Sequence, residues 1–298
     1  MGIKEKLVSI YDNNYKALMI FTFVVLLFAI CILIASYVRT GEFVQKGVTL
    51  KGGITLTIQT KEEIDLLAFE KSLASQLPKA DLTVRKTTEM GVIKAIIIEA
   101  GDVEEQELLS AVKETGIIKL KEGEYSVESM GSSLGSQFFK QTIVAVIIAY
   151  IAMWLVVLLT FREIVPSTFV MLAATANIIC SLAVVSLVGM KLSTAGVEAF
   201  LMLIGYASDT NIMLTTKVLR RKEGTILDRI VSSMKTGLTM TATTLVAAVV
   251  AYFFSTSDVI KQIMIIIIIG LIFDVLNTWM QNTGILRWWV ERKARKAQ

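Results

Sequence analysis

Six long apolar stretches constrain this chain more than any other feature of its sequence. A helix needs about twenty apolar residues to cross the hydrocarbon core of a bilayer, and 54% of the 298 residues are hydrophobic. The first stretch is too long for the core of a signal peptide and has no small-residue cleavage site after it, so we expect it to remain as an anchor. The sequence predicts a polytopic α-helical membrane protein with six transmembrane helices, at residues 17–38, 138–161, 165–188, 195–214, 238–254 and 263–286.

The distribution of Lys and Arg predicts the side of the membrane that each loop faces. Fifteen of these residues lie in the two ends of the chain, at Arg162 and in the loop after the fourth stretch, whereas the short loops of the other side hold only Lys191 and Lys261. Cytoplasmic loops carry the excess of basic residues. We therefore expect a cell-membrane protein whose cytoplasmic parts are the N-terminus (1–16), the basic loop (215–237) and the basic tail (287–298). Every basic cluster adjoins an apolar stretch, so topology explains these clusters and nucleic-acid binding is not expected.

A polar insertion, residues 39–137, separates the first two stretches and is expected as one domain outside the cytoplasm. Alternating apolar residues predict strands near 54–58, 82–84 and 118–127, and the apolar run at 92–98 predicts a buried strand. Apolar residues at helical spacing predict helices near 66–77 and 108–112, the second ending near Gly116. The order β-α-β-β-α-β indicates an extracytoplasmic α+β domain of the ferredoxin-like type.

The composition argues against an enzyme or a metalloprotein. The chain has no histidine, which removes the commonest general base and metal ligand. Its two cysteines, Cys31 and Cys180, lie in apolar runs and are too few for a structural zinc site. No glycine-rich phosphate loop opens either helix of the polar domain. We therefore expect no cofactor and no metal.

Three acidic residues fall inside or at the edge of the predicted spans. Glu198, at the outer start of the fourth, is expected to reach the interface. Asp209 lies deeper, close to Tyr206, and Asp274 lies near the middle of the sixth. An ionised side chain at mid-bilayer costs about 2.5–3.5 kcal/mol, so each of the two deep acids must face another helix, a partner or water. Either is a hydrogen-bonded packing group or a protonatable relay, and the sequence leaves both alternatives open.

In the relay interpretation, neighbouring polar groups hydrogen-bond the ionised form of Asp209. Thr210 and Asn211 follow it directly in the chain. The fifth span carries further hydroxyl groups that could reach it, although packing is the simpler role for them. These groups belong to Thr239, Thr241, Thr243 and Thr244.

Three motifs occur in order along this topology. They are Gly47-Val48-Thr49-Leu50-Lys51-Gly52-Gly53, Val127-Glu128-Ser129-Met130-Gly131-Ser132-Ser133-Leu134-Gly135 and Leu203-Ile204-Gly205-Tyr206-Ala207-Ser208-Asp209-Thr210. With them the chain resembles, over essentially its whole length, the SecF family of the resistance-nodulation-division (RND) superfamily, and its details resemble the archaeal branch most. We interpret the glycines of the first two motifs as structural: Gly47, Gly52, Gly53, Gly131 and Gly135.

The resemblance implies partners and a role. SecF-like proteins pair with SecD, in a heterodimer or a higher complex, beside the Sec translocation channel, and are thought to use the proton gradient to draw exported polypeptide outward. The fourth-span motif of bacterial relatives is Gly-Tyr-Ser-x-Asn-Asp-Thr, so that Asp209 stands where they have Asn and Thr210 where they have Asp. Those relatives place an Arg at the start of the fifth span, where Lys235 is the only local cation. Gly205 and Tyr206 are candidates for the SecD interface.

Three functions stay open on the sequence. The first is an accessory export motor coupled to protons, with relay candidates Asp209, Asp274, Thr210, Asn211 and Lys235. The second is a scaffold that binds SecD and the channel without ion flux. The third, a small RND-type exporter of small molecules, fits less well because there is one small outside domain. Lys235 has the simpler alternative of a cytoplasmic anchor.

Overall fold

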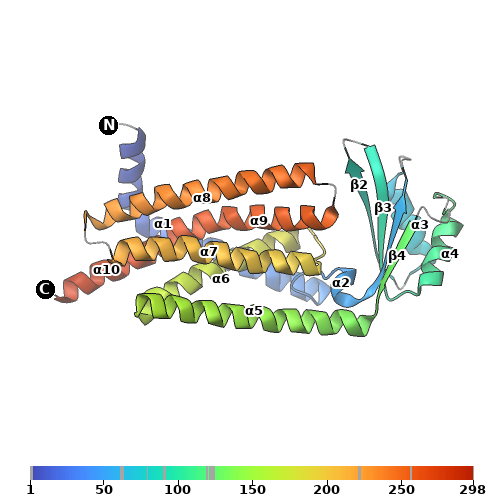
Figure 1. The fold of residues 1–298 in the computed structure, drawn as a ribbon, viewed down its shortest axis with the longest axis horizontal. Helices are drawn as coiled ribbons and strands as arrows, with labels where there is room; N and C mark the ends of the chain where they lie inside the picture. The colour runs from blue at the N-terminus through green and yellow to red at the C-terminus, as the bar shows by residue number, and fades with distance from the viewer. Residues whose placement is uncertain are drawn as a thin grey trace.

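The structure is a computed structural model that describes residues 3–60, 64–78, 80–89, 92–118, 120, 125–220, 223–255 and 257–297. Long helices form a bundle, and a four-stranded sheet with two helices lies at one end of it (Figure 1). Arg221 and Lys222, part of the predicted basic loop, lie outside the described residues.

The bundle is built from the apolar stretches that the sequence singles out. Its helices are α1 (Ile3–Thr40), α5 (Ser132–Phe161), α6 (Ile164–Leu187), α7 (Thr194–Arg220), α8 (Ile226–Phe254) and α9 (Asp258–Leu276). The last of them continues through a π-helical turn, η1 (Asn277–Asn282), into α10 (Thr283–Ala297). In the described part of the chain, five helical segments are long and apolar enough to cross a membrane: Tyr11–Thr40, Gln137–Phe161, Ile164–Leu187, Ile226–Phe254 and Val259–Arg295.

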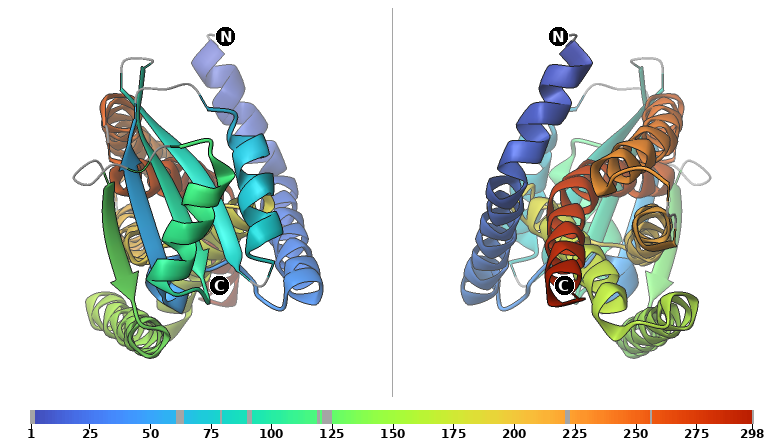
Figure 2. Two further views of the ribbon diagram at one scale, coloured as in Figure 1. Left: turned by 90° about the vertical axis from the view of Figure 1, so that its right-hand side faces the viewer. Right: turned by 90° about the vertical axis from the view of Figure 1, so that its left-hand side faces the viewer.

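Helix α7, which contains the predicted fourth span, is not among these five segments. It carries Glu198 and Asp209 within its apolar sequence and Lys217 and Arg220 in its last turn. It nevertheless lies alongside the other long helices and packs against α6, α8 and α9 (Figures 1 and 2). Six spans therefore stay a prediction, with α7 as the helix in question.

The sheet domain follows the predicted order of elements. In chain order these are β1 (Gly53–Gln59), α3 (Leu66–Gln76), β2 (Asp81–Glu89), β3 (Val92–Gly101), α4 (Glu105–Thr115) and β4 (Tyr125–Met130). The strands pair antiparallel in the order β2-β3-β1-β4. The prediction that the last strand begins near Ile118 is wrong, because Ile118 is buried in the core and β4 begins at Tyr125.

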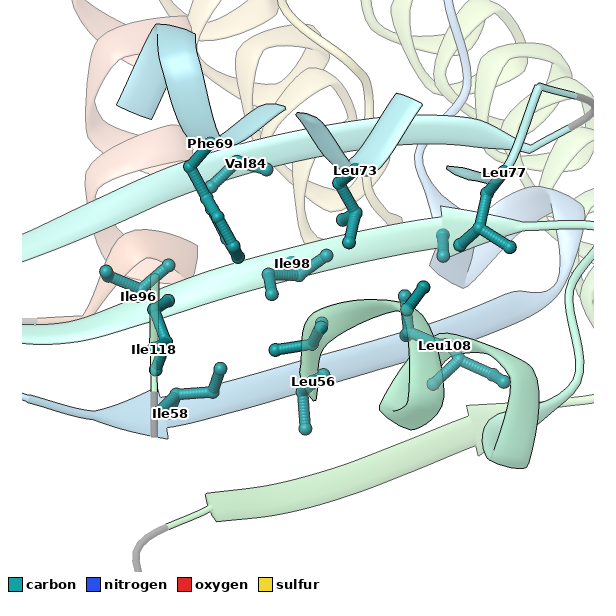
Figure 3. Close-up of a cluster of buried hydrophobic side chains, with 14 residues drawn as sticks. Leu56, Ile58, Phe69, Leu73, Leu77, Val84, Ile96, Ile98, Leu108 and Ile118 are labelled. Carbon is teal, nitrogen blue, oxygen red and sulfur yellow. The ribbon is translucent and has the colours of Figure 1, made fainter. Parts of the chain in front are cut away.

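The two helices of the domain cover one face of the sheet, and the bundle lies toward its other face (Figure 2). Alternate residues of β1 point to the helices, so that Leu56 and Ile58 are buried. They meet side chains of α3 and α4, among them Phe69 and Leu108 (Figure 3). Burying a side chain of this kind contributes about 1.5–3 kcal/mol, which gives the domain a core of its own.

Candidate functional site

The buried carboxylate of Asp274 is the centre of a polar seam between α7 and α9. Asp274 is 2% exposed. Its Oδ2 accepts a hydrogen bond of 3.1 Å from the Thr210 hydroxyl, and its Oδ1 accepts one of 3.0 Å from the Thr278 hydroxyl, one turn further along. Within the described residues no Lys or Arg forms an ion pair with it. The seam thus holds an acid whose hydrogen-bond partners are neutral hydroxyl groups.

A second contact extends the seam by one turn. The Asn282 Nδ2 donates a hydrogen bond of 2.5 Å to the Asn211 Oδ1, and the Asn211 Nδ2 donates to the Ala207 carbonyl at 2.6 Å. Asn211 and Asn282 are both fully buried. Residues 210 and 211 of α7 therefore both face α9 and η1.

The expected hydrogen bonding of Asp209 is wrong. Asp209 is exposed on the surface of α7, while Thr210 faces inward, because consecutive helical residues differ by about 100° in direction. The hydroxyl groups of Thr239, Thr243 and Thr244 donate to carbonyls of their own helix. These three threonines thus belong to other contacts, and Thr210 and Asn211 serve the Asp274 seam.

Asp209 belongs instead to an exposed stripe on α7, formed by Glu198, Met202, Gly205 and Asp209. These residues recur every three or four positions and so share one face of the helix. A Cβ added to Gly205 would have no atom within 4 Å, so no contact within the chain requires this glycine. Tyr206 is half-buried at the edge of the stripe. In the predicted topology, in which α7 crosses the membrane, two carboxylates on its exposed face call for a partner or water.

Lys235 lies on the exposed side of α8, and in the described part of the chain it forms no ion pair. The basic group that reaches this part of α8 is Lys217 of α7. Its Nζ donates to the Ser232 carbonyl at 3.1 Å and to the Thr236 hydroxyl at 3.0 Å. A cation therefore does contact the start of α8, but it comes from the neighbouring helix.

The first glycine motif forms the junction between the sheet domain and the bundle. The four-residue helix α2 (Val48–Lys51) places Leu50, 1% exposed, among the apolar side chains of the bundle. The backbone is fixed on both sides of Leu192, in the loop between α6 and α7. The Gly47 N–H donates to the Leu192 carbonyl at 2.8 Å, and the Leu192 N–H donates to the Gln45 carbonyl at 2.7 Å. The domain is thus held to the bundle by main-chain hydrogen bonds.

Two glycines of the junction have a steric reason. Gly53 has a φ of +139°, and a Cβ there would lie 2.4 Å from the Ala100 carbonyl oxygen. A Cβ on Gly135, in the first turn of α5, would lie 2.6 Å from the backbone nitrogen of Gly52. Gly131, by contrast, has open space where its Cβ would be. Close contacts at Gly53 and Gly135 therefore support the structural interpretation of these two glycines, whereas Gly131 has no such contact.

An ionic cluster at the junction was not predicted from the sequence. Asp81, at the start of β2, forms ion pairs with Lys191 at 2.7 Å and with Lys51 at 3.5 Å, and Lys51 also reaches Glu42 at 3.6 Å. Burial opposes ionisation of Asp81, but the hydrogen bond and charge of Lys191, together with Lys51, outweigh it and lower the pKa of the Asp81 carboxyl below its usual value. The available signal was Lys191 itself, one of the two basic residues in the short loops on that side.

Comparisons with known proteins show which family this chain is similar to. A family model described as "Protein export membrane protein SecD/SecF, C-terminal" matches residues 111–292. A protein named protein-export membrane protein SecF from Pyrococcus furiosus is 38% identical, with 99% of this chain and 97% of that protein covered. One of the same name from Methanocaldococcus jannaschii is 35% identical, with 90% and 95% covered.

A solved structure shows the same fold. The crystal structure of SecDF from Thermus thermophilus, titled a translocon-associated membrane protein, superposes with a TM-score of 0.77 at 13% sequence identity. The match covers 94% of this chain but 38% of that chain, so this chain corresponds to a little over a third of the longer protein.

Proposed function

This chain belongs to the SecD/SecF family of protein-export membrane proteins and is an accessory subunit of protein export; we propose that it acts with a SecD subunit and uses the proton gradient through Asp274. The observation that carries the proposal is the buried, hydroxyl-bonded carboxyl group in the seam between α7 and α9. Thr210, which donates to it, occupies the position at which the bacterial motif has Asp. The acidic side chain thus lies on the sixth predicted span in this chain. It contacts the fourth span at the position where the bacterial motif has its Asp.

Asp274 has the surroundings that reversible protonation inside a bundle requires. It is shielded from bulk solvent, and the hydroxyl groups of Thr210 and Thr278 donate to its ionised form. A proton that crosses a potential of 100 mV releases roughly 2.3 kcal/mol. That free energy shifts a two-state equilibrium by about fiftyfold, enough to bias a movement of the bundle during export.

The proposed topology has six spans, both termini in the cytoplasm of the cell and the sheet domain outside. Helix α7 has 27 residues, about 40 Å at 1.5 Å per residue, and so exceeds the roughly 30 Å of the hydrocarbon core. The antiparallel strand order β2-β3-β1-β4 and the alternation of strands and helices support a ferredoxin-like domain. A cysteine at Ser232 should be labelled from the cytoplasm alone and one at Ser126 from outside alone. Labelling of position 126 from the cytoplasm would overturn this orientation.

The proposed SecD contact is the exposed stripe of α7. It presents Glu198 and Asp209, with Met202 and Gly205 between them, and lipid cannot satisfy the two carboxylates. A SecD-like subunit would cover it and bury the exposed edge of Tyr206. The Sec channel and exported polypeptides would then be partners of the complex. Under this assignment Asp209 is an interface residue, and Asp274 carries the proton.

The substitution Asp274→Asn tests the proton role, because it preserves size and hydrogen bonding but cannot titrate. We expect the variant to copurify with SecD and to lose the gradient-dependent part of export in reconstituted vesicles. Glu163→Gln, which neutralises an acid that pairs with Lys293 outside the seam and the stripe, is the control and should retain gradient-dependent export. Full gradient dependence in Asp274→Asn would leave the chain as a non-conducting scaffold for SecD and the channel.

A further inference from the structure

Beyond Asp274, the seam continues toward the end of the bundle that we assign to the cytoplasm. There it contains buried polar side-chain atoms that lack hydrogen-bond partners among the described residues. Of the described residues that have fully buried side-chain nitrogen or oxygen atoms with no hydrogen-bond partner, six lie in this region, on α6, α7 and η1. Each of these residues is at most 2% exposed. They are Asn177 on α6, Thr215 on α7, and Asn277, Trp279, Gln281 and Asn282 on η1.

These residues come from helices that pack against one another. Thr215 lies one turn beyond Asn211, which contacts η1 directly. On α6, Cys180 packs in one cluster with Phe273 of α9. Asn177 lies one turn from Cys180 and Asn277 one turn from Phe273, both toward the cytoplasmic end, so the two amides share a similar depth.

The turn η1 is itself irregular. It is π-helical, a rare form that occurs mostly as single turns inside α-helices and frequently at functional sites. Its Trp279 carbonyl accepts a hydrogen bond of 2.5 Å from the Tyr11 hydroxyl of α1. In η1, main-chain as well as side-chain polar groups therefore point toward the neighbouring helices α1 and α7.

The unpaired atoms identify the kind of ligand that can satisfy them. Four are N–H donors, on Asn177, Asn277, Trp279 and Gln281, and the others are oxygens. A cation would bind the oxygens and leave the donors unpaired. A SecD subunit cannot reach atoms that this chain already buries. Water both donates and accepts, and buried water normally bridges such groups.

We propose that a chain of internal water molecules bridges the unpaired groups of α6, α7 and η1 and connects Asp274 to the cytoplasmic end of the bundle. This deepens the proposed function and rests on it for its purpose. On release, the proton leaves the Asp274 carboxyl for the first water, each water passes one proton to the next, and one proton reaches the cytoplasm. At the same end of the bundle, Arg287 of α10 forms ion pairs with Asp12 at 2.6 Å and with Glu291 at 2.8 Å.

Cysteine accessibility tests the water chain independently of export. In a SecD-bound chain lacking its own thiols (Cys31→Ser, Cys180→Ala), single cysteines are introduced by Thr215→Cys, close in size to the native residue, and by Gln281→Cys. Vesicles of either orientation are then treated with a small charged methanethiosulfonate. The cysteine thiolate attacks the sulfenyl sulfur of the reagent, forms a disulfide and displaces methanesulfinate. A thiolate needs water around it, so both positions should react about tenfold or more faster than a dry buried thiol, from the cytoplasmic side only.

The control is Ala183→Cys, equally buried on α6 but among the apolar side chains near Cys180. Reaction of Thr215→Cys and Gln281→Cys as slow as this control from both faces overturns the water chain, while the Asp274→Asn assay still decides the proton role. Fast reaction together with full gradient dependence in Asp274→Asn establishes the water but refutes its use for proton release.

Discussion

The ionic cluster at the junction gives a prediction that can be worked out quantitatively. Asp81 of the sheet domain and Lys191 of the bundle lie 2.7 Å apart, with side chains 47% and 13% exposed. A fully exposed pair contributes about 0.2–1 kcal/mol. Because Lys191 is largely buried and Lys51 adds a second cation, we place the effect of Asp81→Asn near the top of that range, about 1 kcal/mol.

Amide hydrogen exchange at the junction measures this loss. The N–H groups of Gly47 and Leu192 bond across the junction and exchange when it opens. A loss of about 1 kcal/mol speeds that opening about fivefold, since 1.4 kcal/mol corresponds to a factor of ten. Lys191→Met should have a similar effect, and the double variant should be little faster than either single one.

The pH dependence has a definite sign. The folded-state pKa of Asp81 lies below its ordinary value of 3.8, so the pair stabilises the junction fully above pH 3.8 and is lost as the pH falls through the lower folded value. The difference in amide exchange rate between wild type and Asp81→Asn should therefore disappear as the pH falls below about 3.8. Glu163→Gln, which removes an ion pair of the same 2.7 Å length with Lys293 at the other end of the bundle, is the control. Equal exchange in wild type and Asp81→Asn at pH 6, or additive effects in the double variant, would refute the reasoning.

Two further predictions concern the same junction. Gly135→Ala should destabilise the purified chain by about 1–3 kcal/mol in thermal unfolding, because its Cβ meets the Gly52 backbone, and the clash exceeds the helix-propensity gain of about 1 kcal/mol. Gly131→Ala, with open space around it, should stay within about 0.5 kcal/mol of wild type, and equal melting of the two variants would contradict the contact. Gln262→Leu removes the hydrogen bond of 2.7 Å from α9 to the Lys191 carbonyl, and gradient-dependent export should fall while SecD binding persists. Unchanged export would exclude this contact from the coupling.

Much of the fold follows from periodicity, whereas the site depends on which way each helix faces. Alternating residues such as Ile54, Leu56 and Ile58 indicate β1 because one face of a strand is buried. The acid at 209 and the threonine at 210 look equivalent in the sequence, since both lie in one apolar helix. Their roles separate only when the neighbours of α7 are known, because a step of one residue turns the side chain by about 100°.

The partner of a buried group is likewise invisible when it comes from a distant segment. Thr210 and Asp274 lie 64 positions apart in the chain, and no local spacing relates them. A clue was present, because the bacterial motif has Asp where this chain has Thr210, and an acid missing from one helix can be supplied by its neighbour. The docking of Leu50 was hidden for the same reason: a four-residue helix gives no periodic pattern, and its burial depends on the loop between α6 and α7.

Helix α9 physically joins the two regions described here. Near its outer end, Gln262 donates to the Lys191 carbonyl, and Lys191 in turn holds Asp81 of the sheet domain. Twelve residues further along, about 18 Å at 1.5 Å per residue, Asp274 meets Thr210 of α7. A helix transmits displacement along its axis because its backbone hydrogen bonds resist stretching. Under the proposed function, a change of charge at Asp274 that shifts α9 against α7 would act on the loop that holds the sheet domain. This is the connection that the proposed proton-driven role requires.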